Sequence, residues 1–98
     1  MNIGTAIKTL RKQKGWGQSE LAEKCNISVN ALSQIERNSS FPQKGTINSI
    51  CKSLGVPVSY LLYFSITDED LPEDKKQVFT SLDSAIKSIL LDTINSKD

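Results

Sequence analysis

The sequence has no histidine and only two cysteines among its 98 residues. Cys25 and Cys51 form no CxxC pair, and a protein zinc site needs about four nitrogen or sulfur ligands. We therefore expect neither a metal site nor a cofactor. Each cysteine lies among apolar neighbours at helical spacing, so both are expected to be reduced residues of the core.

Long apolar runs are also missing. None approaches the roughly 20 residues that span a bilayer, and the first five residues lack the apolar stretch of a signal peptide. We expect a cytoplasmic protein with no membrane partner. A chain of 98 residues with 38% apolar content has room for one domain and a short appendage.

The residue types of an active site are not arranged for catalysis. There is no glycine-rich phosphate loop, and none of the acids and serines falls into a nucleophile–base pattern. We expect a protein that is not an enzyme.

Charge divides unevenly along the chain. Residues 1–64 carry eight lysines and arginines against three glutamates, whereas residues 65–98 carry four lysines against eight acids. The first part therefore has a net charge of +5 and the second −4, although the whole chain has only +1. A basic first part suits a polyanionic partner.

Apolar residues spaced by three and four predict an all-α fold. Five short helices are expected, at residues 3–14, 18–25, 28–37, 46–54 and 58–63. An acidic linker at 65–73 and one long amphipathic helix within 74–98 follow. Asn2, Ser28 and Thr46 have the side chains expected of N-caps, and Gly15, Asn26, Asn38 and Gly55 suit helix ends.

The second and third helices are separated by only two or three residues, from Cys25 to Ser28. So short a turn excludes antiparallel packing and predicts a steep crossing. That geometry lets a second helix place its solvent face in a DNA major groove about 12 Å wide while the first supports it.

Three stretches resemble the Xre family, the Cro and phage-repressor type of helix-turn-helix. Residues 17–24 (GQSELAEK) resemble its Thr-Gln-Glu-Glu-Leu-Ala signature. Residues 28–38 (SVNALSQIERN) resemble its recognition helix, which normally closes with Ile-Glu-Arg-Gly, and residues 52–56 (KSLGV) resemble Ala-Leu-Gly-Val. The resemblance covers residues 3–64 and implies a five-helix, repressor-like DNA-binding domain. Gly17 in place of the threonine cap, and Asn26 and Asn38 in place of glycines, depart from the pattern.

The resemblance implies that the third helix contacts bases, and the residue types agree. Asn30 and Gln34 are spaced i,i+4, so one face presents two amides, each able to pair with adenine N6 and N7. Val29 suits a thymine methyl group. The expected base-contacting residues are Ser28, Val29, Asn30, Ser33 and Gln34.

Phosphate contacts are expected around this helix. Gln18 begins the second helix, whose first N–H groups and dipole attract anions. The other candidates follow the third helix: Arg37, Ser39, Ser40 and Lys44. Lys12 and Lys14 add positive charge. By the resemblance, Arg11 and Glu36 form a buried structural ion pair between the first and third helices.

The long C-terminal helix carries an apolar stripe: Val78, Phe79, Leu82, Ile86, Ile89 and Leu90. Either this stripe packs on its own domain, or it forms a dimer interface. We favour dimerisation, because the first five helices already have matched inner faces and paired half-sites suit two-fold symmetry. The acidic linker is either a solvated hinge or a segment that competes with DNA for the basic face.

Together these features predict a sequence-specific transcriptional regulator, with repression as the favoured role. It would insert residues 28–37 into the major groove of a palindromic operator as a homodimer. The alternative is an antitoxin or a protein-interaction module that binds a partner through its tail helix.

Overall fold

The structure is a computed structural model that describes residues 1–95, with side chains described through Asp92. Its α-helices are α1 (Ile3–Gln13), α2 (Gln18–Cys25), α3 (Val29–Glu36), α4 (Lys44–Leu54), α5 (Val58–Ser65) and α6 (Lys76–Asn95). Two short 3₁₀ turns, Asp68–Asp70 and Glu73–Lys75, precede α6, and residues 1–95 contain no strand. The predicted all-α fold is confirmed. Residues 96–98, the end of the predicted tail helix, lie outside the described residues.

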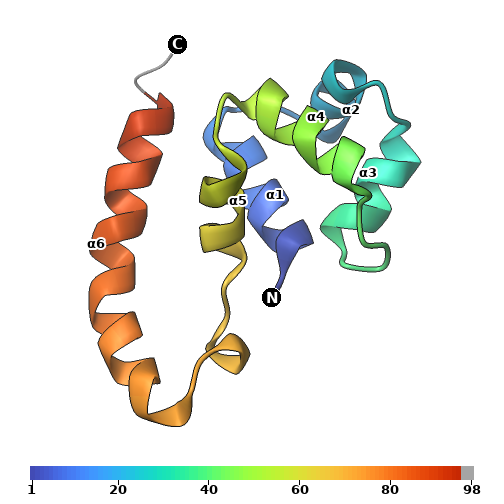
Figure 1. Ribbon diagram of the computed structural model, residues 1–98. Helices are drawn as coiled ribbons and strands as arrows, with labels where there is room; N and C mark the ends of the chain where they lie inside the picture. The colour runs from blue at the N-terminus through green and yellow to red at the C-terminus, as the bar shows by residue number, and fades with distance from the viewer. Residues whose placement is uncertain (96–98) are drawn as a thin grey trace.

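Helices α1 and α5 form the middle of the molecule (Figure 1). The helices α2, α3 and α4 pack at one side of this pair, and α6 runs along the other side. One apolar cluster is shared by the five helices from α1 through α5. Each of these five supplies at least one fully buried side chain: Ile7, Leu10, Leu21, Leu32, Ile50, Leu54 and Leu61. Cys25 and Cys51 are free and buried in the same cluster, as predicted.

The start of α1 is capped by a residue distant in sequence, not by its own N-cap. Asn2 makes no side-chain cap hydrogen bond, so the prediction for it is wrong. Instead, Asn38 lies just past α3 in the left-handed conformation (φ +62°) and accepts from the backbone N–H of Gly4 at 3.0 Å. A Cβ on Gly4 would lie 1.9 Å from the carbonyl oxygen of Ile35. Glycine is therefore what lets α1 approach the end of α3.

Three other predicted helix ends are confirmed, and the predicted cap of α4 is wrong. Ser28 caps α3, with its hydroxyl accepting from the N–H of Ala31 at 3.0 Å. Asn26 and Gly55 end α2 and α4 with φ values of +59° and +74°. Thr46 does not cap α4, because that helix begins two residues earlier, at Lys44.

The acidic connection is folded against the N-terminus of the chain. Its first predicted residue, Ser65, belongs to α5, is fully buried and accepts from the N–H of Asn2 at 2.8 Å through its carbonyl oxygen. The Met1 ammonium lies 3.0 Å from Asp70. A backbone N–H from Thr67 and this ammonium together lower the pKa of the Asp70 carboxyl.

Helix α6 docks on α5 through a few side chains. The Tyr63 hydroxyl donates to Asp83 at 3.0 Å, and the Tyr63 and Phe79 ring centroids are 6.1 Å apart. The ammonium of Lys87 lies 5.7 Å from the ring centre of Phe64, and Leu91 packs against the core. No helix among residues 1–95 is long and apolar enough to cross a membrane.

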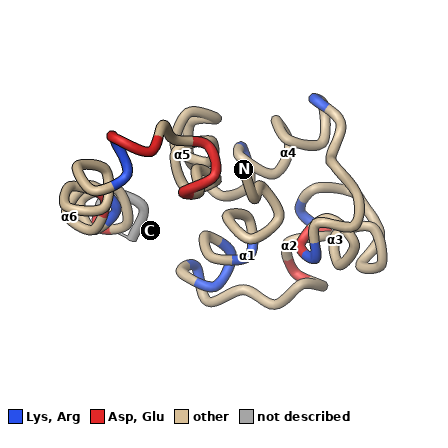
Figure 2. Tube along the Cα trace, turned by 90° about the horizontal axis from the view of Figure 1, so that it is seen from below, with Lys and Arg blue, Asp and Glu red and all other residues tan. Residues whose placement is uncertain are grey.

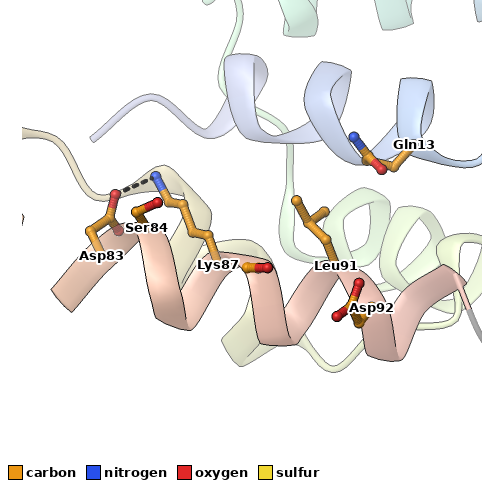
Figure 3. Close-up of a pocket in the computed structure, with 7 residues that line it drawn as sticks. Gln13, Asp83, Ser84, Lys87, Leu91 and Asp92 are labelled. Atoms are coloured by element: carbon orange, nitrogen blue, oxygen red, sulfur yellow. Dashed lines mark ion pairs between the residues drawn. The ribbon is translucent and has the colours of Figure 1, made fainter.

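Between α1 and α6 lies a shallow groove of about 540 Å³. Gln13 of α1 points across it towards Leu91 of α6, and the Asp83–Lys87 ion pair lines the same groove (Figure 3). Because polar side chains separate the two helices here, α6 is packed on its domain less tightly than the other helices are on one another.

Candidate nucleic-acid interface

A tight turn positions α3 after α2. Asn26 ends α2 in the left-handed conformation, and the N–H of Ile27 donates to the Ala22 carbonyl oxygen at 3.0 Å. Ile27 then packs against the core, and Ser28 caps α3. The two helices are thus joined by three residues, as the sequence predicts for a helix-turn-helix.

Helix α3 has a buried face and an outer face. Leu32, Ile35 and Glu36 are buried. Of the five predicted base-contacting residues, Ser28, Val29 and Asn30 are exposed, and Ser33 and Gln34 are half-buried. Val29 is unusually open for a valine, with 44% of its surface exposed.

The outer face carries two amides that bond to none of the residues the structure describes. Asn30 and Gln34 lie one helical turn apart, and neither side chain forms a hydrogen bond to another of the described residues. Ser28 differs, because its hydroxyl oxygen already accepts from Ala31. A hydroxyl keeps its own donor when it accepts, so Ser28 can still donate outward.

A buried polar network fixes α3 to α1 and α2. The Arg11 guanidinium donates to both carboxylate oxygens of Glu36, Nε to Oε2 at 2.7 Å and Nη2 to Oε1 at 3.0 Å. A third donor, Nη1, bonds the carbonyl oxygen of Trp16 at 2.7 Å. The predicted Arg11–Glu36 pair is present, with side chains only 7% and 2% exposed.

Sequence reasoning missed the role of the Gln18 side chain in that network. Its Nε2 donates to Glu36 Oε1 at 3.0 Å, whereas the sequence predicts a role only for its backbone N–H. No local pattern links residues 18 apart in the chain, so this contact had no signal in the sequence. The backbone N–H of Gln18 still lies in the first turn of α2, whose cap position, Gly17, has no side chain to satisfy it.

The remaining phosphate candidates follow α3. Arg37, Ser39, Ser40 and Lys44 are all exposed, and Lys44 is the first residue of α4. Gln43 at the cap position of α4 makes no side-chain hydrogen bond. A lysine at the positive end of a helix dipole does not stabilise that helix, whereas the two together attract an anion.

One exposed residue in this loop was not predicted. Phe41 lies between Ser40 and the buried Pro42, and 72% of its surface is exposed. The signal available in the sequence is that an aromatic residue interrupts a loop of otherwise mostly polar residues.

Acidic residues gather on the connection between α5 and α6, on the opposite side of the molecule from α3 (Figure 2). Lysines and arginines gather at the end of α1. The acidic connection therefore does not cover the outer face of α3. Across residues 1–95, no group of three or more cysteine, aspartate or glutamate side chains is placed to hold a metal ion.

Comparison with known proteins agrees with this scaffold. Residues 7–61 match the helix-turn-helix family model HTH_3. The regulator SutR of Escherichia coli is 46% identical over 57 residues, which are 58% of this chain and 32% of SutR. The immunity repressor protein of Bacillus phage phi105 is 32% identical over 81 residues, 83% of this chain and 54% of the repressor.

A longer match is SinR of Bacillus licheniformis, described as an HTH-type transcriptional regulator. It is 31% identical over 96 residues, 97% of this chain and 83% of SinR. No solved structure is significantly similar. The chain belongs to the helix-turn-helix family of the Xre type. It spans only a third to a half of the length of SutR and the phage repressor.

Proposed function

We propose that this protein is a sequence-specific DNA-binding transcriptional regulator that acts as a repressor. The observation that carries the proposal is the outer face of α3, where two amides without a hydrogen-bond partner among the described residues lie side by side on a helix fixed by a buried ion pair. Its relatives, which are transcriptional regulators and a phage immunity repressor, support the same role.

In this proposal α3 enters the major groove. The amides of Asn30 and Gln34 contact adenine edges, Val29 contacts a thymine methyl group, and Ser28 and Ser33 donate or accept through their hydroxyls. The buried network holds Glu36, at the end of α3, at a fixed distance from α1 and α2. A base-contacting helix needs such support, because a shift of an ångström breaks a bidentate hydrogen bond.

Phosphates on either side of the groove would be bound by two helix starts and one loop. The first N–H groups of α2, next to Gln18, form one anion site, and Lys44 with the first turn of α4 forms another. Ser39 and Ser40 lie in the exposed loop before α4 and add hydroxyl donors.

We also propose that the protein acts as a homodimer on a palindromic operator, through the open face of α6. Val78, Leu82, Ile86 and Ile89 are 58%, 55%, 38% and 64% exposed, whereas Phe79 and Leu90 are half-buried. The stripe predicted from the sequence is therefore divided between the protein's own domain and solvent. A second copy would cover the solvent side.

The deciding experiment is selection of binding sites from random DNA, followed by titration of the selected site and of random DNA. Asn30→Ala and Gln34→Ala should each weaken specific binding by roughly 1–3 kcal/mol and leave non-specific binding nearly unchanged. Gln77→Ala, which removes an exposed amide on α6, is the matched control. Equal losses on both DNAs would contradict base contact, and a wild-type protein that enriches no sequence would contradict the proposed function.

A further inference from the structure

Arg37 continues the outer face of α3. Its backbone N–H still donates to the carbonyl oxygen of Ser33 at 3.1 Å, so the residue lies on the helical path although it is the C-cap. Residues three, four and seven positions apart share a helix face. Arg37 therefore lies in the same row as Asn30, Ser33 and Gln34.

The guanidinium is folded back along this row. Its Nη1 donates to the Ser33 hydroxyl oxygen at 3.1 Å, one turn towards the start of the helix. Among the described residues Arg37 forms no ion pair, because the neighbouring Glu36 is taken by Arg11. An arginine has five N–H donors, so most of those on Arg37 stay available on the outer face.

The backbone on both sides of Arg37 is fixed. Glu36 is bound by Arg11 and Gln18, and Asn38 bonds the N–H of Gly4 at 3.0 Å and donates to the Thr5 hydroxyl at 3.2 Å. A phosphate contact tolerates a mobile cation, whereas a bidentate base contact requires a placed guanidinium. The anchored backbone and the Ser33 hydrogen bond meet that requirement.

We propose that Arg37 contacts a guanine edge in the major groove, at O6 and N7, and so determines one base of each half-site. Its position after Gln34 places that guanine at the end of the half-site contacted by the last turn of α3. This inference rests on the proposed function. It changes the role of Arg37 from the phosphate contact expected from the sequence to a specificity-determining residue.

The test is site selection with the wild type, Arg37→Ala and Arg37→Lys, followed by titration of the selected operator and of single-base changes in it. In the wild-type motif, one guanine should be required, and replacing it should weaken binding by about 5- to 150-fold. For Arg37→Ala, replacing the same guanine should change the binding affinity little, while the base preferences at the other operator positions stay as in the wild type. Arg37→Lys keeps the charge without the planar fork, so it should lose most of the same preference.

Lys44→Ala provides the contrast, because loss of a phosphate contact should weaken binding on all sequences alike. The inference is overturned if Arg37→Ala selects the wild-type motif and loses affinity equally on operator and random DNA, or loses none. A wild type that selects no motif would overturn the proposed function, and this inference with it. Thermal unfolding of each variant confirms that it is folded, as expected for an exposed residue.

Discussion

Glu36 is the carboxylate to which α1, α2 and α3 are all attached. It accepts from Arg11 and Gln18 while its own side chain is 2% exposed. A buried ion pair is weak support for stability as a whole, because desolvation opposes the attraction. Removing only one of the two charged residues destabilises the fold, because the other charge then stays buried without a partner.

We therefore expect Glu36→Gln to destabilise the protein by roughly 3–5 kcal/mol, because Arg11 would remain charged and buried without an anion. The measurement is the free energy of unfolding from urea denaturation. Glu23→Gln, an exposed glutamate on α2, is the control and should change it by less than about 0.5 kcal/mol. A Glu36→Gln variant as stable as that control would show that the network carries no stability.

A single-residue prediction for binding concerns Lys44. If this lysine neutralises a phosphate, Lys44→Ala should lower the slope of log K against log salt by about one unit, through loss of one released counterion. Lys75→Ala removes an exposed lysine near α6, far from α3, and should leave the slope unchanged. An unchanged slope in Lys44→Ala would mean that the lysine is only a solvated surface charge.

At the scale of elements, α6 has two faces with different partners. Phe79, Asp83, Lys87 and Leu91, each four residues after the last, face α5 and α1. Val78, Leu82 and Ile86 face solvent. Tyr63 attaches α6 twice, through a ring contact with Phe79 and a hydrogen bond to Asp83.

Tyr63→Phe should loosen α6 by about 1 kcal/mol, because the ring contact stays and only the hydrogen bond to Asp83 is lost. Amide hydrogen exchange in α6 should then be about fivefold faster, while exchange in α1 to α4 stays the same. Tyr60→Phe serves as the control, because Tyr60 lies on the same helix and its hydroxyl forms no hydrogen bond to the described residues of α6. Equal exchange rates in both variants would contradict the attachment.

The pH dependence of docking follows from the same contact. Burial, and then the hydrogen bond to Asp83, raises the pKa of the Tyr63 hydroxyl above its ordinary value. A raised pKa in the folded state contributes stability below the ordinary pKa, and this is lost as pH rises through the folded value. As pH rises through this range, the protection of α6 amides relative to their intrinsic, base-catalysed exchange rate should therefore fall in the wild type but much less in Tyr63→Phe.

Element positions followed from the sequence because helix periodicity and the caps at Ser28, Asn26 and Gly55 are local signals. What was missed depends on distant residues. The cap of α1 comes from Asn38, 34 residues from Gly4, and Gln18 reaches Glu36. The outer face of α3 could be predicted because the helix has a clear inner side, whereas the fold-back of Arg37 required the structure.

At the scale of the whole molecule, α3 and α6 lie on opposite sides of the α1–α5 pair (Figure 1). A dimer formed through α6 would place the two copies of α3 at its far ends, free of the interface. Two recognition helices of a symmetric dimer contact half-sites separated by one DNA turn of about 34 Å or by a multiple of it. The acidic connection lies on the α6 side and would not meet DNA in such an assembly.

The prediction at this scale is that one charge on the open face of α6 separates the copies. Leu82 lies on that face and is 55% exposed, so Leu82→Glu should cost the monomer little but bury an unpaired carboxylate in the dimer. Sedimentation equilibrium should show a dimer for the wild type and a monomer for Leu82→Glu, with equal helix content by circular dichroism. Ile86→Glu should behave in the same way.

Operator binding should weaken by roughly 100-fold or more in Leu82→Glu, because the second half-site no longer benefits from effective concentration, while binding to a single half-site stays unchanged. Gln77→Glu adds the same charge to α6 at an exposed position before the apolar stripe, and it should remain dimeric. A Leu82→Glu variant that stays dimeric would move the interface to another surface. A wild type that is monomeric at tens of micromolar would instead favour a different protein as the partner of the open face, the arrangement expected of an interaction module.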